Sequence, residues 1–420
     1  MPILEDKVTH EQMANAIRAL AMDAVEKAKS GHAGLPMGAA DIATVLFTKV
    51  LKYDAAAASW PDRDRFVLSA GHGCMLLYAL LYLTGEPSMT IAELQRFRQL
   101  GSRTPGHPEY RHAPGVEATT GPLGQGLANA VGMALAERML NTEFGPIVDH
   151  RTYVLVSDGD LMEGISQEAI AIAGHLRLNR LIAFYDDNHV TIDGPTSLAD
   201  SVDQVKRFQA CNWNAVRIDG QDQKAILRAI RKAQKAELPS LIACKTIIGF
   251  GMPTRAGTSK AHSDAPGAEE IAGARRNLNW PYEPFVIPEP ILAAWRRAGN
   301  RGRARRKAWN AALNLLPTAQ RDEFERRLRG DLPASFGEAV TAYKRKLAED
   351  RSPIATRKAS QATLEVLAKT IPELVTGSAD LTPSNNTKVA GMVDIGPSSY
   401  SGRYVHWGVR EHGMAAAVNG

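Results

Sequence analysis

Short apolar runs alternate with stretches of helical periodicity from the start of the chain to about residue 245. Thr9 and Gln12 form a capping-box pattern ahead of apolar residues at helical spacing, which predicts an amphipathic first helix. Strands are predicted at 66–69, 153–157, 181–185, 215–218 and 240–245. The intervening helices are predicted at 75–83, 125–140, 167–176, 202–210 and 224–235. This alternation predicts an α/β protein with a doubly wound, mostly parallel sheet, which binds ligands beyond the carboxyl ends of its strands.

The pattern changes in the last third of the chain. Basic, helix-rich sequence broken by prolines follows residue 266, and the strand–helix alternation resumes only after Pro353. There we expect a helix near 361–370, strands near 374–378 and 404–407, and a helix that begins at Glu411. We divide the chain into a first α/β domain at 1–266, a helix-rich linker at 267–353 and the start of a second α/β domain at 354–420. The last segment is too short for a complete doubly wound domain, so we expect that domain to be incomplete.

Composition narrows the class of protein. The 420 residues are 44% hydrophobic and 23% charged, without a low-complexity tract, which is typical of a globular chain of about two or three folding units. The chain has no signal-like start, no bilayer-length apolar stretch and only three widely spaced cysteines, so we expect a cytoplasmic protein without a membrane partner. The net charge of +5 is concentrated at 296–307, which predicts a helix with one solvated basic face and leaves nucleic-acid binding a minor hypothesis.

Oxygen donors follow two of the predicted strands at the point where each strand ends. Asp158 and Gly159 come directly after strand 153–157, and Asn188 lies 30 residues beyond Asp158, after the next strand. One strand–helix–strand crossover has this length, so neighbouring parallel strands bring the donors together. The Asp158 carboxylate, the Asn188 side-chain oxygen and a backbone carbonyl, which we assign to Val190, would bind Mg²⁺ together with diphosphate and water. Gly159 lets the backbone approach a phosphate, although a tight turn is the alternative interpretation of Asp158 and Gly159 alone.

This arrangement resembles the Gly-Asp-Gly and distant Asn of thiamine-diphosphate enzymes, with Ser157 in place of the first glycine. Further segments resemble the transketolase family in chain order, at 30–38, 68–73, 101–108, 119–126, 158–164, 186–188, 378–384 and 409–414. Full transketolases continue well past residue 420, so the chain resembles a carboxyl-terminally truncated one. The resemblance implies the thiamine-diphosphate-binding fold, with thiamine diphosphate and Mg²⁺, or another divalent cation such as Ca²⁺ or Mn²⁺, as cofactors.

The resemblance also implies roles for individual residues. The implied catalytic residues are Glu411, which meets the aminopyrimidine ring of the cofactor, and His32, His107 and His262. The implied cofactor contacts are His72, Gly121, Pro122, Leu123, Gly159, Glu163, Asn188 and His262. The implied substrate contacts are His32, His107, His262, Arg357, Asp380 and Ser384. Among these, Arg357 and Ser384 match phosphate-binding positions, and a guanidinium with a hydroxyl suits a phosphate dianion.

The activity implied is transfer of a two-carbon ketol unit from a ketose phosphate to an aldose phosphate. In this family each active site lies between the subunits of a homodimer, and the role is in the pentose phosphate pathway or the Calvin cycle. We expect this chain alone to be poorly active, because groups that contact the cofactor and the substrate in such a site would be missing. A dihydroxyacetone synthase or another thiamine-diphosphate synthase is the nearest alternative. A non-catalytic dimerisation or binding module is the alternative from another class.

Overall fold

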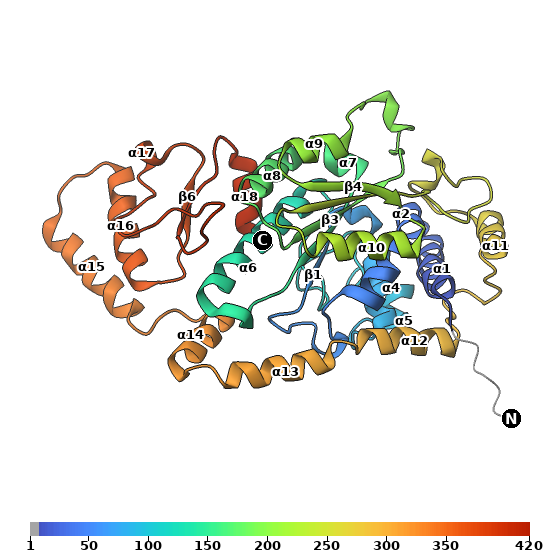
Figure 1. The fold of residues 1–420 in the computed structure, drawn as a ribbon, viewed down its shortest axis with the longest axis horizontal. Helices are drawn as coiled ribbons and strands as arrows, with labels where there is room; N and C mark the ends of the chain where they lie inside the picture. Colours follow the sequence, from blue (N-terminus) through green and yellow to red (C-terminus); the bar gives the residue numbers. More distant parts are fainter. Residues whose placement is uncertain (1–7) are drawn as a thin grey trace.

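The centre of the molecule is a five-stranded parallel sheet, in a computed structural model that describes residues 8–420 (Figure 1). The amino-terminal segment 1–7, in which the sequence shows no signal-like pattern, lies outside the described residues. The strands are β1 (Arg65–Leu68), β2 (Thr152–Ser157), β3 (Leu181–Asp187), β4 (Asn214–Asp219) and β5 (Ser240–Lys245), in the order β1-β2-β3-β5-β4. Every neighbouring pair is parallel, so the predicted fold class is confirmed.

Helices cover both faces of this sheet. One face carries α1 (His10–Ala28), α2 (Gly34–Gly38), α3 (Ala40–Val45), α4 (Met75–Thr84) and α10 (Gln223–Ala233), and the other carries α6 (Gln125–Phe144), α8 (Gly164–His175) and α9 (Gln204–Ala210). Successive side chains of a strand point to opposite faces, so Tyr153 and Leu155 join the first core whereas Val154 and Val156 join the second. The capping box that the sequence predicts at Thr9 and Gln12 is confirmed at the start of α1.

Helices dominate the chain after the sheet. They are α11 (Ala268–Asn277), α12 (Glu289–Gly299), α13 (Arg303–Asn314), α14 (Thr318–Arg329), α15 (Phe336–Asp350) and α16 (Thr356–Thr370). A two-stranded parallel sheet of β6 (Thr376–Ser378) and β7 (Tyr404–His406) follows, with α17 (Thr382–Asn385) between the strands and α18 (Glu411–Asn419) after them. Figure 1 shows α15, α16, α17 and β6 at the opposite end of the molecule from α1 and α2. The last helix, α18, returns to pack against α6 and α8.

The basic run differs from the prediction of one helix with a single solvated face. It spans the end of α12 and the start of α13, and three of its side chains bind the sheet-containing part of the chain. Arg296 donates to the Tyr82 carbonyl at 2.6 Å, Arg301 donates to the Leu51 carbonyl at 2.6 Å, and Arg306 forms an ion pair at 2.7 Å whose acceptor is a buried Asp54 carboxylate. Part of the positive charge of this run is therefore bound within the fold instead of lying on a solvated face. No helix within residues 8–420 is both long enough and apolar enough to span a membrane.

Candidate active site

A group of acidic side chains lies where β2 and β3 end side by side. Ser157 of β2 is in register with Asp186 of β3, and Asp158 follows directly. The sequence analysis predicts no helix between the strand at 153–157 and the helix at 167–176, but Asp158 begins a short helix, α7 (Asp158–Met162). The reason is that Ser157 caps this helix, in a capping box completed by the Asp160 side chain. Asp158 is thereby held in a helical turn and buried, with 6% of its surface exposed.

The Asp158 carboxylate is only half satisfied by the protein. One oxygen accepts a hydrogen bond from the Tyr185 hydroxyl, whereas Oδ2 is buried and has no hydrogen-bond partner among residues 8–420. Burial raises the pKa of Asp158 to about 7, and the charges of Asp186 and Asp187 contribute to the rise. A buried carboxylate oxygen without a donor is unfavourable unless a cation faces it. The site therefore fits a bound metal ion.

Asn188 and Val190 follow β3 at the edge of the sheet where Asp158 follows β2. The Asn188 Nδ2 donates to Asp186 at 2.8 Å, and its Oδ1 accepts from the Val190 N–H at 2.9 Å. Both residues line one cavity of about 130 Å³ together with Gly159. The cavity is smaller than a typical binding pocket for a drug-sized ligand.

Three histidines from separate segments lie together, and two of them, His72 and His262, line this cavity. His32 lies between α1 and α2, His72 lies in a short turn after β1, and His262 follows another short turn. Their ring centroids are 5.1 Å apart for His32 and His72, 5.5 Å for His32 and His262, and 5.0 Å for His72 and His262. Gly34 lets the segment after His32 approach the segment before His262, because a Cβ on Gly34 would lie 2.2 Å from the Ala261 carbonyl oxygen.

These imidazoles are neutral at neutral pH. Burial lowers the pKa of His32 to about 4 and that of His72 to about 3, and the neighbouring histidines and Arg98 add to the effect on His32. Burial also lowers the pKa of His262. The Nδ1 atoms of His32 and His262 are buried without a hydrogen-bond partner among residues 8–420. Neutral rings with unused nitrogens can donate to or accept from a polar ligand.

The predicted cofactor loop divides between two hollows. Leu123 lines the cavity that contains His72 and His262. Gly121 and Pro122 instead line a neighbouring open hollow with His107, whose pKa is lowered by burial and by Arg98. Gly121 has a φ of +139°, which favours glycine, and a Cβ there would also crowd the His107 ring at 3.1 Å.

Five predicted site residues lie elsewhere in the chain. All are exposed: Glu163 at the junction of α7 and α8, Arg357 at the start of α16, Asp380 and Ser384 at α17, and Glu411 at the start of α18. None of them lines the cavity with the histidines. The helices α16 and α17 lie at the far end of the molecule from α2 (Figure 1). Within one chain Arg357, Asp380 and Ser384 are therefore separate from the three histidines.

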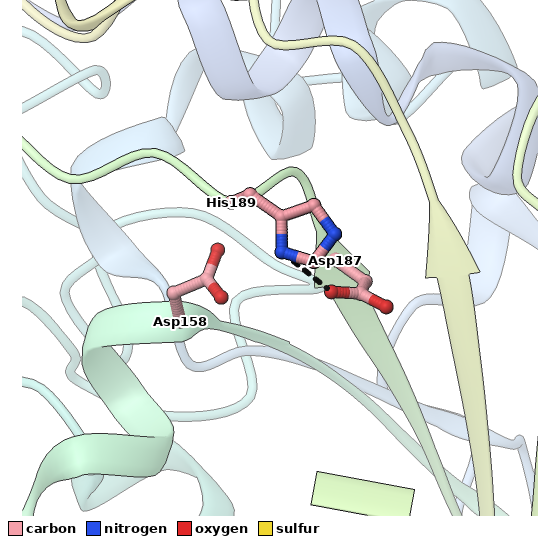
Figure 2. Close-up of side chains that lie close together, drawn as sticks. All are labelled: Asp158, Asp187 and His189. Atoms are coloured by element: carbon pink, nitrogen blue, oxygen red, sulfur yellow. Dashed lines mark ion pairs between the residues drawn. The ribbon is translucent and has the colours of Figure 1, made fainter. Parts of the chain in front are cut away.

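Three residues that the sequence analysis did not single out belong to this region. Asp160 is fully buried and accepts from Ser69 at 2.7 Å and from the Gly124 N–H at 2.8 Å. Asp187 and His189 place donor atoms beside Asp158, with all three donor atoms within 4.8 Å of one another (Figure 2). The run of acidic residues and a histidine at the end of a predicted strand is the signal that could have identified them.

Comparisons with known proteins agree with this geometry. The family described as "Transketolase, thiamine diphosphate binding domain" matches residues 9–333, and "Transketolase, pyrimidine binding domain" matches residues 352–420. The transketolase of Cereibacter sphaeroides is 53% identical over 410 residues, which are 97% of this chain and 62% of that protein. The solved transketolase of Leishmania mexicana has 42% identity and a TM-score of 0.91, and that of Pichia stipitis in complex with sedoheptulose 7-phosphate has 40% and 0.90. Each structural match covers 98% of this chain and 62% of the other, so the chain spans about 62% of the length of these relatives.

Proposed function

Since this chain belongs to the transketolase family, we propose that it takes part in thiamine-diphosphate-dependent transfer of a two-carbon ketol unit from a ketose phosphate to an aldose phosphate. The observation that carries the proposal is the cavity where His72, Leu123, Gly159 and His262 converge beyond the strand ends. Gly159 directly follows Asp158, whose Oδ2 has no hydrogen-bond partner among residues 8–420. Ligands of open α/β sheets bind at this edge.

The proposed metal ligands are Asp158, Asn188 and the Val190 carbonyl, with Mg²⁺ as the ion, or Ca²⁺ or Mn²⁺ in its place. The buried Oδ2 of Asp158 supports this assignment because a hard cation would satisfy it. Asn188 Oδ1 already accepts from the Val190 N–H, but an amide oxygen has a second lone pair for a metal. The proposed contacts to the rest of the cofactor are His72, Gly121, Pro122, Leu123, Gly159, Glu163 and His262.

The proposed chemistry divides between cofactor and side chains. When bound, thiamine diphosphate supplies the electron sink that lets a carbon–carbon bond next to a carbonyl break. His32, His107 and His262 would orient the hydroxyls of the ketose and hold or move protons at their ring nitrogens. The lowered pKa values support this role, since a neutral imidazole accepts a proton without first losing one.

The proposed substrates are sugar phosphates, as in the sedoheptulose 7-phosphate complex of the Pichia stipitis enzyme. Arg357 and Ser384 would bind the phosphate and Asp380 a hydroxyl. These residues lie away from the histidines, so we propose a homodimer in which the second copy supplies them, together with Glu411, to complete each site. We keep the division at 1–266, 267–353 and 354–420 as part of this proposal. We also propose that these 420 residues, assayed alone, turn over sugar phosphates slowly.

Calorimetric titration with thiamine diphosphate, with and without Mg²⁺, tests the central assignment. We expect Mg²⁺-dependent binding that Asp158→Ala abolishes. Binding that does not depend on Mg²⁺, or that survives Asp158→Ala unchanged, would contradict the proposal.

Turnover is tested with xylulose 5-phosphate as donor. Ribose 5-phosphate as acceptor reports ketol transfer between sugar phosphates, whereas a preference for formaldehyde would favour a dihydroxyacetone synthase. A rate typical of the full-length relatives would refute the proposed slow turnover of this chain alone.

A further inference from the structure

Arg98 lies between two of the segments that carry the predicted histidines. Its Nη1 donates to the Ser30 hydroxyl at 2.8 Å, two residues before His32. A Cβ on Gly106 would lie 3.2 Å from Arg98 Nε and 3.4 Å from its Cζ, so the guanidinium packs directly on the residue before His107. One side chain therefore contacts the segment of His32 and the segment of His107.

The residue before Arg98 packs into the same junction. A Cβ on Gly31, whose φ is +133°, would lie 2.8 Å from Phe97 Cε1, so the Phe97 ring packs directly against this glycine. Phe97 is buried, and its ring centroid lies 6.4 Å from that of Tyr78. The Tyr78 hydroxyl donates to the His107 carbonyl at 3.1 Å. These contacts fix the place of Arg98 from both sides.

The guanidinium of Arg98 forms no ion pair among residues 8–420. Its Nε is buried without a hydrogen-bond partner in this part of the chain, and the acceptor of its Nη1 is an uncharged hydroxyl. Arg96, by contrast, faces Glu93 at 3.5 Å. A partly buried cation without a carboxylate is unfavourable, and Arg98 also has a φ of +63°, which is uncommon for a residue with a Cβ. Unfavourable features of this kind collect at functional sites.

The charge of Arg98 acts on His107. Burial lowers the pKa of this ring, Arg98 lowers it further, and Glu109 opposes them. At His32, burial and His262 lower the pKa more than Arg98 does, so His107 is the ring that reports on Arg98. A positive charge disfavours the imidazolium, and the neutral ring is the form that can accept a proton.

We propose that Arg98 is a positioning residue for the proposed ketol transfer: it ties the segment of His32 to the segment of His107 and places an unpaired positive charge near both rings. The part that the two rings play in that reaction rests on the proposed function. The tether and the charge do not, because they are properties of this chain before any ligand binds. Arg98 acts through the histidines, since it lines neither the cavity nor the hollow that contains His107.

The titration of His107 tests the inference without cofactor or substrate. The 420-residue chain, labelled with ¹³C at the histidine Cε1 atoms, is titrated by NMR, and His107→Gln assigns the signal. Arg98→Gln removes the charge and keeps an N–H donor, so His107 should titrate at a higher pH than in the wild type. Arg98→Lys keeps the charge and should leave the midpoint near its wild-type value.

Arg96→Gln is the matched control. Arg96 is half exposed, pairs with Glu93 and lies two residues from Arg98, so its loss should leave the His107 midpoint unchanged. Ser30→Ala is a second test of the tether, because it frees the Arg98 guanidinium without altering the charge of the chain, and it should raise the midpoint by less than Arg98→Gln does. It also serves if Arg98→Gln does not fold. An unchanged midpoint in Arg98→Gln, or an equal rise in Arg96→Gln, would overturn the inference.

Calorimetry with Mg²⁺ and thiamine diphosphate separates this inference from the proposed function. Arg98→Gln should keep Mg²⁺-dependent cofactor binding, because Arg98 does not line the cavity. Loss of that binding together with a lower urea midpoint would show a general structural role and would also overturn the inference. Normal cofactor binding without a shift at His107 would reject the role of Arg98 alone. A shift at His107 in a chain that binds no cofactor would reject the proposed function and leave the tether and the charge in place.

Discussion

Replacement of Asp160 by alanine should unfold the edge of the sheet where the proposed site lies. Asp160 is fully buried, and its two oxygens accept four hydrogen bonds. The donors are the Ser69 hydroxyl at 2.7 Å, the Gly124 N–H at 2.8 Å, and the Ser157 N–H and hydroxyl, both at 2.9 Å. One carboxylate thus joins the end of β1, the start of α6 and the cap of α7.

The magnitude follows from the donors that alanine would leave behind. The two hydroxyls can rotate toward other acceptors, but the Gly124 and Ser157 amides would be buried without a partner. Each such amide costs about 1–3 kcal/mol, so Asp160→Ala should lower the free energy of unfolding by about 2–6 kcal/mol. Asp160→Asn keeps an acceptor on one side only, so about half of that loss is expected.

Urea denaturation at pH 7, followed by circular dichroism, measures these differences. Asp222→Ala is the comparison, since Asp222 caps α10 at the surface through one bond from the Lys224 N–H at 2.7 Å, and it should cost far less. An Asp160→Ala protein within about 1 kcal/mol of the wild type would refute the reasoning, because the two amides would then have found other partners.

Three further predictions follow from packing and from titration. Gly34→Ala should push apart the segments that carry His32 and His262, because its Cβ would lie 2.2 Å from the Ala261 oxygen. Calorimetry should then show weaker Mg²⁺-dependent cofactor binding. Gly337→Ala is the control, since a Cβ there would have no atom within 4 Å, and it should lower neither cofactor binding nor stability. Gly132→Ala should detach α18, since its Cβ would lie 1.9 Å from the Ala417 oxygen, and limited proteolysis should then cut near residue 411, whereas an unchanged digestion pattern would contradict this packing. His72 has a pKa of about 3, below the value near 6.5 of an unfolded histidine, so the unfolded chain binds the proton first and stability is lost as the pH falls from 6.5 toward 3. Urea midpoints recorded against pH should fall less steeply in this window for His72→Gln, and equal slopes would show that His72 is not buried in its neutral form.

The sheet and the helix caps could be predicted because the cause of each lies in consecutive residues. Strands β2 and β3 are buried on both faces, so each is a continuous apolar run, and the cap of α1 needs only Thr9 and Gln12. The geometry of the candidate site is harder to predict from the sequence, because its contacts join segments that are distant in the chain. The residues next to Asp158 in the sequence do not predict that the Tyr185 hydroxyl donates to one of its carboxylate oxygens, or that the other oxygen has no hydrogen-bond partner among residues 8–420.

Other differences have equally specific physical reasons. The helix α7 was missed because Ser157 ends a strand and caps a helix at the same time. The basic run reads as solvated because a sequence does not show that the acceptors for Arg296, Arg301 and Arg306 lie more than 200 residues earlier in the chain. Arg357, Asp380, Ser384 and Glu411 are exposed in one chain, and the contacts that they would make in the proposed dimer cannot be derived from periodicity within one chain.

The position of Glu411 is set by the first part of the chain rather than by the small sheet that precedes it. The strands β6 and β7 are three residues each, whereas α18 packs so closely on α6 that Gly132 meets the Ala417 carbonyl. The Gly413 N–H donates to Glu168 of α8 at 2.6 Å, and the side chains of His412 and Gln125 lie 2.9 Å apart. Gln125 is the first residue of α6, directly after the loop that carries Gly121, Pro122 and Leu123. The loop with Gly121, Pro122 and Leu123 and the helix that begins at Glu411 are therefore joined within one chain through Gln125 and His412, whereas in the proposed dimer they would serve different sites.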